Sequence, residues 1–254
     1  HDTCIAHLKH IDAHGIRCLR MLAAGTQTQA EAERYLGASL GTITRTAALY
    51  FPSSDGLRLV PETRSLTFSR EGDVRVLLQE LCAGPGTLAC ANALVPAGET
   101  LLSGEPVTTI TGGGERVLEL NLRGAALEAA ANAGVETWQV CGALTMTLGS
   151  FLPELDAVRL SVDGEPLSEA WRDGEALSFA DGMMRRKDFS AFLGSAVQLY
   201  LADAENALVP CEMAFSPGSA LSPRALLEAL ISEEIAASLG AFAPVPAQRG
   251  GDFL

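Results

Sequence analysis

The residue types best suited to chemistry gather at the start of the chain. All four histidines, His1, His7, His10 and His14, lie before residue 15, and Cys4 lies among them. On a helix, the spacing from Cys4 to His14 would place several nitrogen and sulfur ligands on one face. One interpretation is therefore a metal site, or a metal-dependent enzyme, that uses this segment. The other, which we favour, is a poorly ordered leader without a site, because disorder concentrates at chain termini.

The rest of the sequence lacks the residue patterns that catalysis needs. No histidine follows residue 14, so a histidine base is excluded there, and no Gly-x-Ser-x-Gly nucleophile turn is present. The triple glycine 112–114 precedes Glu115, which would repel a phosphate. We interpret carboxylates such as Asp55, Glu62 and Asp163 as solvated turn residues. The sequence thus predicts no catalytic residue, no cofactor and no metal site in residues 41–254.

Charge and hydropathy limit the partners. The net charge of −13 argues against nucleic acid, whose phosphates would repel this chain. No uninterrupted apolar run approaches the length of about 18 residues that a membrane span requires. Residues 21–26 are similar to the end of a bacterial lipoprotein signal, but Thr26 stands where the lipidated cysteine would be. We expect contact with a membrane only through an anchor that is not present in this chain.

The cysteines do not form a recognisable redox or zinc motif. None of the six lies in a C-x-x-C pair, and a chain of 254 residues does not need disulfides to be stable. Cys141 lies on an apolar helical face and is predicted to be a core residue. Cys82 and Cys90 flank a Gly-Pro-Gly turn, so a disulfide between them is an alternative that the sequence leaves open.

A repeated stretch organises the elements that would carry any site. Residues 49–61 and 199–210 both begin with Leu-Tyr and end with Leu-Val-Pro. The first copy contains Ser-Ser-Asp-Gly, a typical hairpin turn, and a helical segment follows each copy. A repeat of about 150 residues is too long for a solenoid unit, so it predicts two copies of one domain.

The first copy contains a full set of alternating strands and helices. Apolar spacing predicts a helix that begins at Asp73, and strict alternation predicts a strand over 117–122. The longest helix is expected over 136–152, with a wide buried face. The other expected elements are strands at 62–69, from Leu101, over 105–111 and over 158–162, and a short helix over 125–133.

The order and spacing of these motifs resemble a known family. Leu-Tyr-Phe, Asp-Gly and Leu-Val-Pro at 49–61 are followed by Ala-Gly-Pro at 83–85, Leu-Val-Pro-Ala-Gly-Glu-Thr-Leu-Leu at 94–102 and Val-Arg-Leu-Ser-Val-Asp-Gly-Glu-Pro at 158–166. Together they resemble the GerM domain of sporulation and spore germination, which often occurs in tandem. The resemblance covers residues 46–167 well and 196–232 in part.

The resemblance implies an α+β fold and a division of the chain. Each domain would be a small mixed or antiparallel sheet covered by helices on one face, in the order β-α-β-β-α-β, similar to the ring-building domains of envelope secretion systems. We therefore expect a leader or linker over 1–46, a first domain over 47–167, a connector over 168–195 and an incomplete second domain over 196–254. The second copy is incomplete because a Pro- and Gly-rich tail replaces the later strands and helix.

The resemblance also implies a non-enzymatic function. It points to an extracytoplasmic assembly or binding module of the sporulation or germination machinery, located in the cell envelope. Its partners would be envelope or sporulation-complex proteins and possibly a second copy of itself, without nucleic acid. The candidate contact residues are the two repeat tyrosines and a basic cluster in an acidic chain: Tyr50, Tyr200, Arg185, Arg186 and Lys187.

Overall fold

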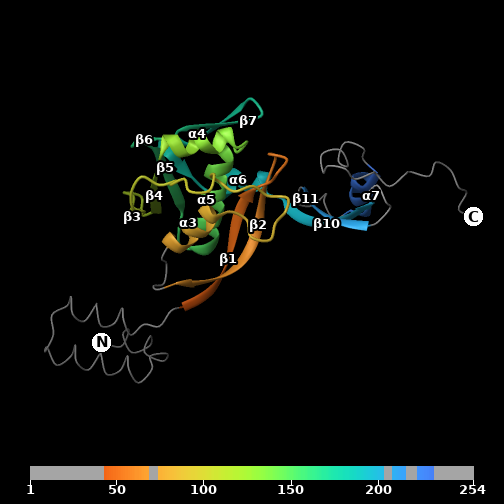
Figure 1. Cartoon of the computed structure of the whole chain (residues 1–254). Coiled ribbons are helices and arrows are strands. Elements are labelled where there is room, and N and C mark those ends of the chain that lie inside the picture. Colours follow the sequence, from red (N-terminus) through yellow and green to blue (C-terminus); the bar gives the residue numbers. More distant parts are fainter. Residues whose placement is uncertain (1–42, 69–73, 203–207, 216–221, 232–254) are drawn as a thin grey trace, which may run out of the picture. The chain divides into compact units, whose positions relative to one another are not determined.

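The computed structural model describes residues 43–68, 74–202, 208–215 and 222–231 (Figure 1). The chain divides into two compact units, which are described separately: residues 1–46 with 65–76, and residues 47–64 with 77–254. The histidine-rich segment, and with it the metal interpretation, lies outside the described residues. The fold is α+β, as the sequence predicts.

The described part of the chain begins with a two-stranded sheet of β1 (Ile43–Pro52) and β2 (Leu59–Phe68). The turn between the strands is closed by Gly56, whose N–H donates to the Ser53 carbonyl at 2.9 Å and whose φ is +74°. This positive φ is accessible to glycine at little cost. The hairpin predicted from Ser-Ser-Asp-Gly is therefore confirmed.

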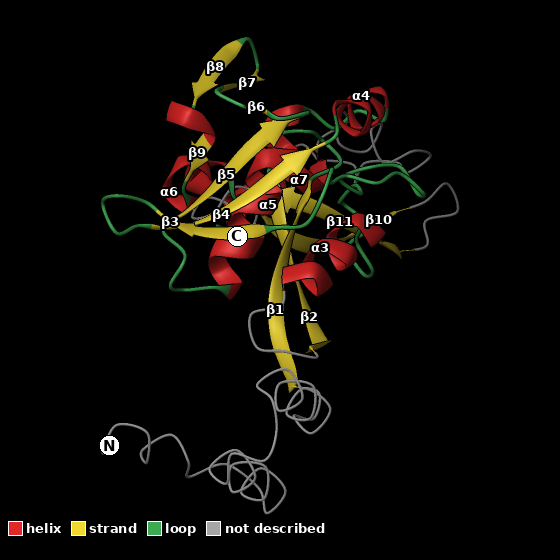
Figure 2. Cartoon of the chain, turned by 90° about the vertical axis from the view of Figure 1, so that its left-hand side faces the viewer, coloured by secondary structure: helices red, strands yellow, loops and turns green. Residues whose placement is uncertain are grey.

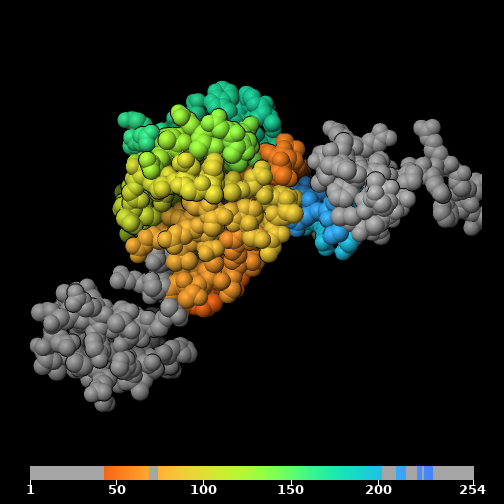
Figure 3. Space-filling model, in the orientation of Figure 1, coloured from red at the N-terminus to blue at the C-terminus, as the bar shows by residue number. Residues whose placement is uncertain are grey.

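Helix α3 (Val74–Ala83) follows, and its apolar stripe is buried as predicted. The residues at the i, i+3, i+4 and i+7 positions, Val74, Leu77, Leu78 and Leu81, are each at most 9% exposed. The helix ends before Gly84, which has a φ of +85°. Asp73, where the helix was predicted to begin, lies outside the described residues. In the space-filling view, the loop of residues 84–106 that comes after α3 appears as a yellow band across the visible surface (Figure 3).

The central sheet of the larger unit is mixed, with strand order β3-β4-β5-β6. The strands β4 (Arg116–Leu122) and β5 (Ala157–Val162) are parallel, while β3 (Val107–Ile110) and β6 (Glu165–Pro166) pair antiparallel with β4 and β5 respectively. Figure 2 shows these strands side by side. The strand predicted from Leu101 is wrong: Leu102 makes only an isolated bridge to Leu122, because Gly104, with a φ of +120°, and Pro106 interrupt it.

Two helices connect the parallel strands, as a parallel crossover requires. They are α4 (Gly124–Asn132) and α5 (Thr137–Phe151). Helix α5 is buried on nearly every side, and it contacts β5 and the segments that follow the sheet. Its first turn is stabilised by a capping box in which the Glu136 N–H donates to Gln139 Oε1 at 2.8 Å. Predicted as the longest helix with a wide buried face, α5 is the core element of the fold.

The opposite face of the central sheet carries a polar ladder. Arg159 Nη1 donates to Glu119 Oε1 at 2.7 Å, and Thr109 Oγ1 donates to the same oxygen at 3.0 Å. The side chains of Glu119 and Arg159 are about one-third exposed, at 35% and 36%. Helix α5 and the polar ladder therefore lie on different faces of the sheet.

Residues 168–195, expected as a connector, contain several short elements. These are β7 (Glu169–Arg172), β8 (Glu175–Ser178), the 3₁₀ turns η2 (Ala180–Gly182) and η3 (Ser190–Phe192), β9 (Met183–Met184) and α6 (Arg186–Phe189). Strand β9 pairs with β5, and Phe179 and Phe189 are buried with their rings stacked 5.6 Å apart. The segment thus adds a strand and aromatic side chains to the core of the larger unit.

Three glycines allow this close packing. A Cβ on Gly142 of α5 would lie 2.5 Å from Leu59 Cδ1 and 2.9 Å from Phe189 Cδ1. A Cβ on Gly149 would lie 2.9 Å from the stem of Arg186, and one on Gly182 would lie 2.4 Å from the Leu160 carbonyl oxygen. The absence of these three side chains lets α6 approach α5 and β9 approach β5.

The last described elements repeat the first ones. Strands β10 (Ser195–Ala202) and β11 (Leu208–Phe215) form an antiparallel pair in which Tyr200 lies opposite Pro210. Helix α7 (Pro223–Ile231) follows and contacts β10. This strand-strand-helix order is that of β1, β2 and α3, as the sequence repeat predicts.

Candidate partner-binding surface

The two repeat tyrosines have different surroundings. Tyr50 on β1 is half-buried, and its backbone N–H donates to Thr147 Oγ1 of α5 at 3.0 Å. Tyr200 occupies the corresponding position on β10, and 52% of its surface is exposed. The structure therefore leaves Tyr200, rather than Tyr50, as the tyrosine that offers a large aromatic surface to another molecule.

The basic cluster is divided by the structure. Arg185 Nη2 donates to Glu115 Oε1 at 2.7 Å, and the Arg185 N–H donates to Asp188 Oδ2 at 2.7 Å. Arg185 thus links the start of α6 to the turn between β3 and β4. The side chains of Arg186 and Lys187 are exposed, and neither forms an ion pair within the described part of the chain. Two of the three predicted cations therefore remain available to an acidic partner.

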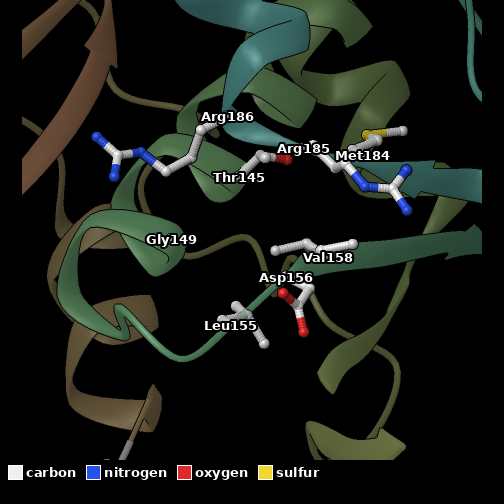
Figure 4. Close-up of a pocket in the computed structure, with 9 residues that line it drawn as sticks. Thr145, Gly149, Leu155, Asp156, Val158, Met184, Arg185 and Arg186 are labelled. Atoms are coloured by element: carbon white, nitrogen blue, oxygen red, sulfur yellow. The ribbon is translucent and has the colours of Figure 1, made fainter. Parts of the chain in front are cut away.

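A small hollow lies between α5, the start of β5 and the β9–α6 segment (Figure 4). Its lining includes Thr145, Asp156 and Met184, and the Thr145 hydroxyl is buried without a hydrogen-bond partner among the described residues. The guanidinium groups of Arg185 and Arg186 point to opposite sides of the hollow in Figure 4. The cavity in the hollow measures about 10 Å³, room for about one water molecule and far below the range of about 300–1,000 Å³ typical of small-molecule sites.

A buried ionic cluster, not predicted from the sequence, holds the loop that follows α3. Glu62 is only 5% exposed, so its interpretation as a solvated turn residue is wrong. Its carboxylate accepts the Arg64 Nε–H at 2.5 Å, and Arg64 also donates to Glu80 Oε2 at 2.8 Å and to the Gly84 carbonyl at 2.6 Å. Glu62 Oε2 in addition accepts three consecutive loop amides, those of Gly86, Thr87 and Leu88, at 2.9, 3.0 and 3.3 Å.

The electrostatics of this cluster follow from its contacts. Burial by itself raises the pKa of Glu62, but hydrogen bonds from Arg64 and from the Thr87 and Gly86 amides outweigh it and hold that pKa below its usual value. The sequence carries a signal for this pair, because Glu62 and Arg64 are two residues apart in a strand and their side chains therefore lie on the same face. Within the cluster each charged side chain has a partner, so the cluster offers no free acid–base pair.

A second carboxylate continues the same loop arrangement. Glu212 Oε2 of β11 accepts the backbone N–H of Ala89 at 2.6 Å and that of Cys90 at 3.3 Å. Successive amides from residue 86 to residue 90 are thus bound first by Glu62 and then by Glu212. Through Glu212 the second hairpin is tied to the loop of the first domain.

The thiols of the described residues are poor nucleophiles. Cys82, Cys90, Cys141 and Cys211 are not in disulfides, so the Cys82–Cys90 alternative does not apply. Burial raises the pKa of Cys141 to about 12, and burial together with the negative charge of Glu212 raises the pKa of Cys90 to about 12. Among the described residues, no group of three or more His, Cys, Asp or Glu side chains is arranged to hold a metal ion. None of their helices is long and apolar enough to cross a membrane.

A comparison with known families gives the identity of the first domain. Residues 48–168 match the family model Germane, described as sporulation and spore germination. Residues 48–168 are thus similar to a Germane domain, in agreement with the GerM resemblance of their motifs. The Germane match ends at residue 168, before β7.

Two solved structures from Bacillus subtilis are similar to this chain. The tandem GerMN domains of the sporulation protein GerM share 20% sequence identity with it, over 69% of this chain and 62% of that chain, with a TM-score of 0.37. The first GerMN domain of GerM shares 21% identity, over 57% of this chain and 99% of that chain, with a TM-score of 0.41. The similarity thus spans less than two thirds of the tandem protein. No curated protein matches the chain.

Proposed function

We propose that this chain is a non-enzymatic assembly module of the sporulation or spore germination machinery. It acts outside the cytoplasm, in the cell envelope, and binds envelope or sporulation-complex proteins through its second hairpin and its unpaired cations. Attachment to the membrane, where it occurs, depends on an anchor outside this chain. The observation that carries the proposal is the exposure of Tyr200. This aromatic side chain is 52% exposed, whereas its counterpart Tyr50 is more buried.

The size of the second hairpin supports the proposal. Among the described residues, β10 and β11 form a sheet of only two strands, covered by the single helix α7. A two-stranded sheet is marginally stable on its own, and three or more strands or additional packing are needed for independent stability. A partner that packs against Tyr200 would supply that additional surface, and aromatic side chains are enriched at the centres of protein interfaces.

Two exposed cations also support a surface that binds a protein partner. Arg186 and Lys187 are exposed and without an ion pair in the described part of a chain whose net charge is −13. Such cations would orient an acidic partner and speed its association more than they would tighten the complex. Both residues lie close to β10 in the sequence, which begins at residue 195.

The test is complementation in the bacterium that carries the gene. The chain would be replaced by Tyr200→Ala, or by Arg186→Glu with Lys187→Glu, and heat-resistant spores and germination rate would be measured. Matched controls are Trp171→Ala, another exposed aromatic, and Arg123→Glu, another exposed cation. We expect both test variants to impair spore formation or germination and both controls to leave it intact. Normal spores from variants that fold and accumulate like the wild type would refute the proposal.

The metal-dependent alternative is tested separately. Removing residues 1–40 and measuring bound zinc, copper and iron in the purified chain addresses it directly. We expect no metal in either form and no hydrolase or transferase turnover in the intact chain. Stoichiometric metal that disappears with residues 1–40, or turnover abolished by one substitution, would favour the alternative.

A further inference from the structure

Strand β3 (Val107–Ile110) is the outer strand of the central sheet. It pairs with β4 from Val107 opposite Glu119 to Ile110 opposite Arg116. Within the described residues no strand pairs with its other side, and Figure 2 shows it beyond β4 in the sheet. An outer strand presents a row of N–H and C=O groups that another chain can bind.

Strand β3 lacks the features that normally protect such an edge. Val107 and Ile110 are 52% and 70% exposed, and Ile110 is more exposed than any other large apolar side chain in the described residues. Residues 106–114, from Pro106 to the triple glycine, contain no charged residue. Natural edge strands usually carry a lysine, an inward charge, a bulge or a central proline. On the opposite side of the sheet, β6 contains Pro166 and β9 is only two residues long.

We propose that β3 pairs antiparallel with β3 of a second copy, so that two central sheets join across a two-fold axis. Directly opposite residues in an antiparallel pair lie on the same face of the sheet, and side chains alternate between faces along each strand. The two-fold axis therefore passes through a residue opposite its own copy. The two central residues, Thr108 and Thr109, are the positions at which the four-residue strands overlap most. Either register sets threonine against threonine, a favourable cross-strand pair.

The charge of the chain makes a second copy the fitting occupant of this edge. Two chains with a net charge of −13 repel each other, so a contact between copies is least opposed where the surface carries no charge. Residues 106–114 are such a stretch. In the Thr109-centred register Glu105 lies opposite Gly113 of the second copy, and in the Thr108-centred register it lies opposite Thr111. A basic or acidic partner would gain no charge complementarity from this uncharged strand.

This surface is distinct from the one proposed for envelope partners, which uses Tyr200, Arg186 and Lys187. A contact of two short strands is a small interface, so the dimer is expected to be weak, with a Kd between about 1 μM and about 1 mM. The central sheet would then extend through two copies, and each dimer would present two second hairpins.

The first test is the mass of the full chain in solution as its concentration is raised through that range, by sedimentation velocity. We expect the wild type to shift from monomer to dimer, Ile110→Lys to remain monomeric and Trp171→Lys to behave like the wild type. Trp171 is the matched control because it is 60% exposed and lies on β7, outside the proposed edge. Thermal melts of the three chains establish that each is folded.

The second test locates the axis. Thr108→Cys or Thr109→Cys, whichever lies on the axis, would form a disulfide-linked dimer under mild oxidation, because opposite Cα atoms about 4.5–5.5 Å apart suit a disulfide. Val107→Cys, Ile110→Cys and the unsubstituted chain are the controls. A wild type that stays monomeric throughout, or a dimer that forms equally with Ile110→Lys, would overturn the pairing. Either result would leave the complementation test of the envelope surface unaffected.

Discussion

The substitution Glu62→Gln tests whether the buried ionic cluster stabilises the fold. Glutamine has nearly the same shape but carries one NH₂ group in place of an acceptor oxygen. In the wild type both carboxylate oxygens face donors: Oε1 accepts from Arg64, and Oε2 accepts from the loop amides beginning at Gly86. In either orientation of the amide, glutamine therefore sets a donor against a donor.

The expected loss of stability follows from the burial of Glu62 and from the partner that Arg64 keeps. Removing one member of a buried ion pair costs about 3–5 kcal/mol. Arg64 keeps Glu80 at 2.8 Å, so the lower end, about 3 kcal/mol, is expected. For a chain of this size this corresponds to a fall in Tm of about 6–12 °C. Glu165→Gln, at an exposed position on β6, is the matched control and should change stability by less than about 0.5 kcal/mol.

The pH dependence gives the experiment a second readout. The folded-state pKa of Glu62 lies below its ordinary value of about 4.3, so its stabilisation is complete above that pH and is lost as the pH falls through the folded pKa. The free energies of unfolding of the wild type and of Glu62→Gln, measured in urea, should therefore differ by the full amount at neutral pH and become equal in acid. A difference that persists unchanged at pH 3, or no difference at neutral pH, would contradict our reading of the cluster.

Three further predictions concern packing and thiol reactivity. Gly142→Ala should destabilise the chain by about 1–3 kcal/mol in urea unfolding, because its Cβ would overlap Leu59 and Phe189, whereas Gly112→Ala, with open space around it, should not. Leu144→Ala should cost about 2–5 kcal/mol, since Leu144 is fully buried in α5, and an unchanged melt would show that α5 is not the core element. Cys141 should resist alkylation at pH 8 in the folded chain and react after denaturation, because burial raises its pKa to about 12, and peptide mapping by mass spectrometry measures this.

The sequence predicted those elements whose causes are local. Alternation of Leu118, Leu120 and Leu122 predicted β4, and all three are buried. The Asp163–Gly164 turn was predicted from turn chemistry, and both residues have a positive φ there, +51° and +96°. In each case the residues that decide the structure are neighbours in the chain, so their pattern carries the information.

The features that were missed depend on residues far apart in the sequence. The need for glycine at 142 arises only because Leu59 and Phe189 both approach α5 there. The burial of Glu62 arises because a loop more than twenty residues later places its amides around the carboxylate. Residues 168–195 have a polar, charged sequence, but β9 and the stacked Phe179 and Phe189 join the core. Local pattern does not reveal such approaches.

The contrast between the two hairpins connects the fold to the proposed function. In the first hairpin, backbone groups that point outward are bound by the rest of the larger unit: Tyr50 N–H by Thr147 Oγ1 at 3.0 Å, Pro52 C=O by Asn92 N–H at 2.7 Å and Leu59 C=O by Gly194 N–H at 2.8 Å. Within the described residues, β10 has no counterpart of these contacts. Within the described residues, outward backbone groups of the Leu-Tyr strand are therefore bound by the rest of the unit in the first copy and not in the second. Because buried backbone groups need partners, a protein that packs over β10 would have to supply donors and acceptors like those of Thr147 and Asn92. This requirement predicts a partner with polar groups at the contact, in addition to an apolar surface for Tyr200.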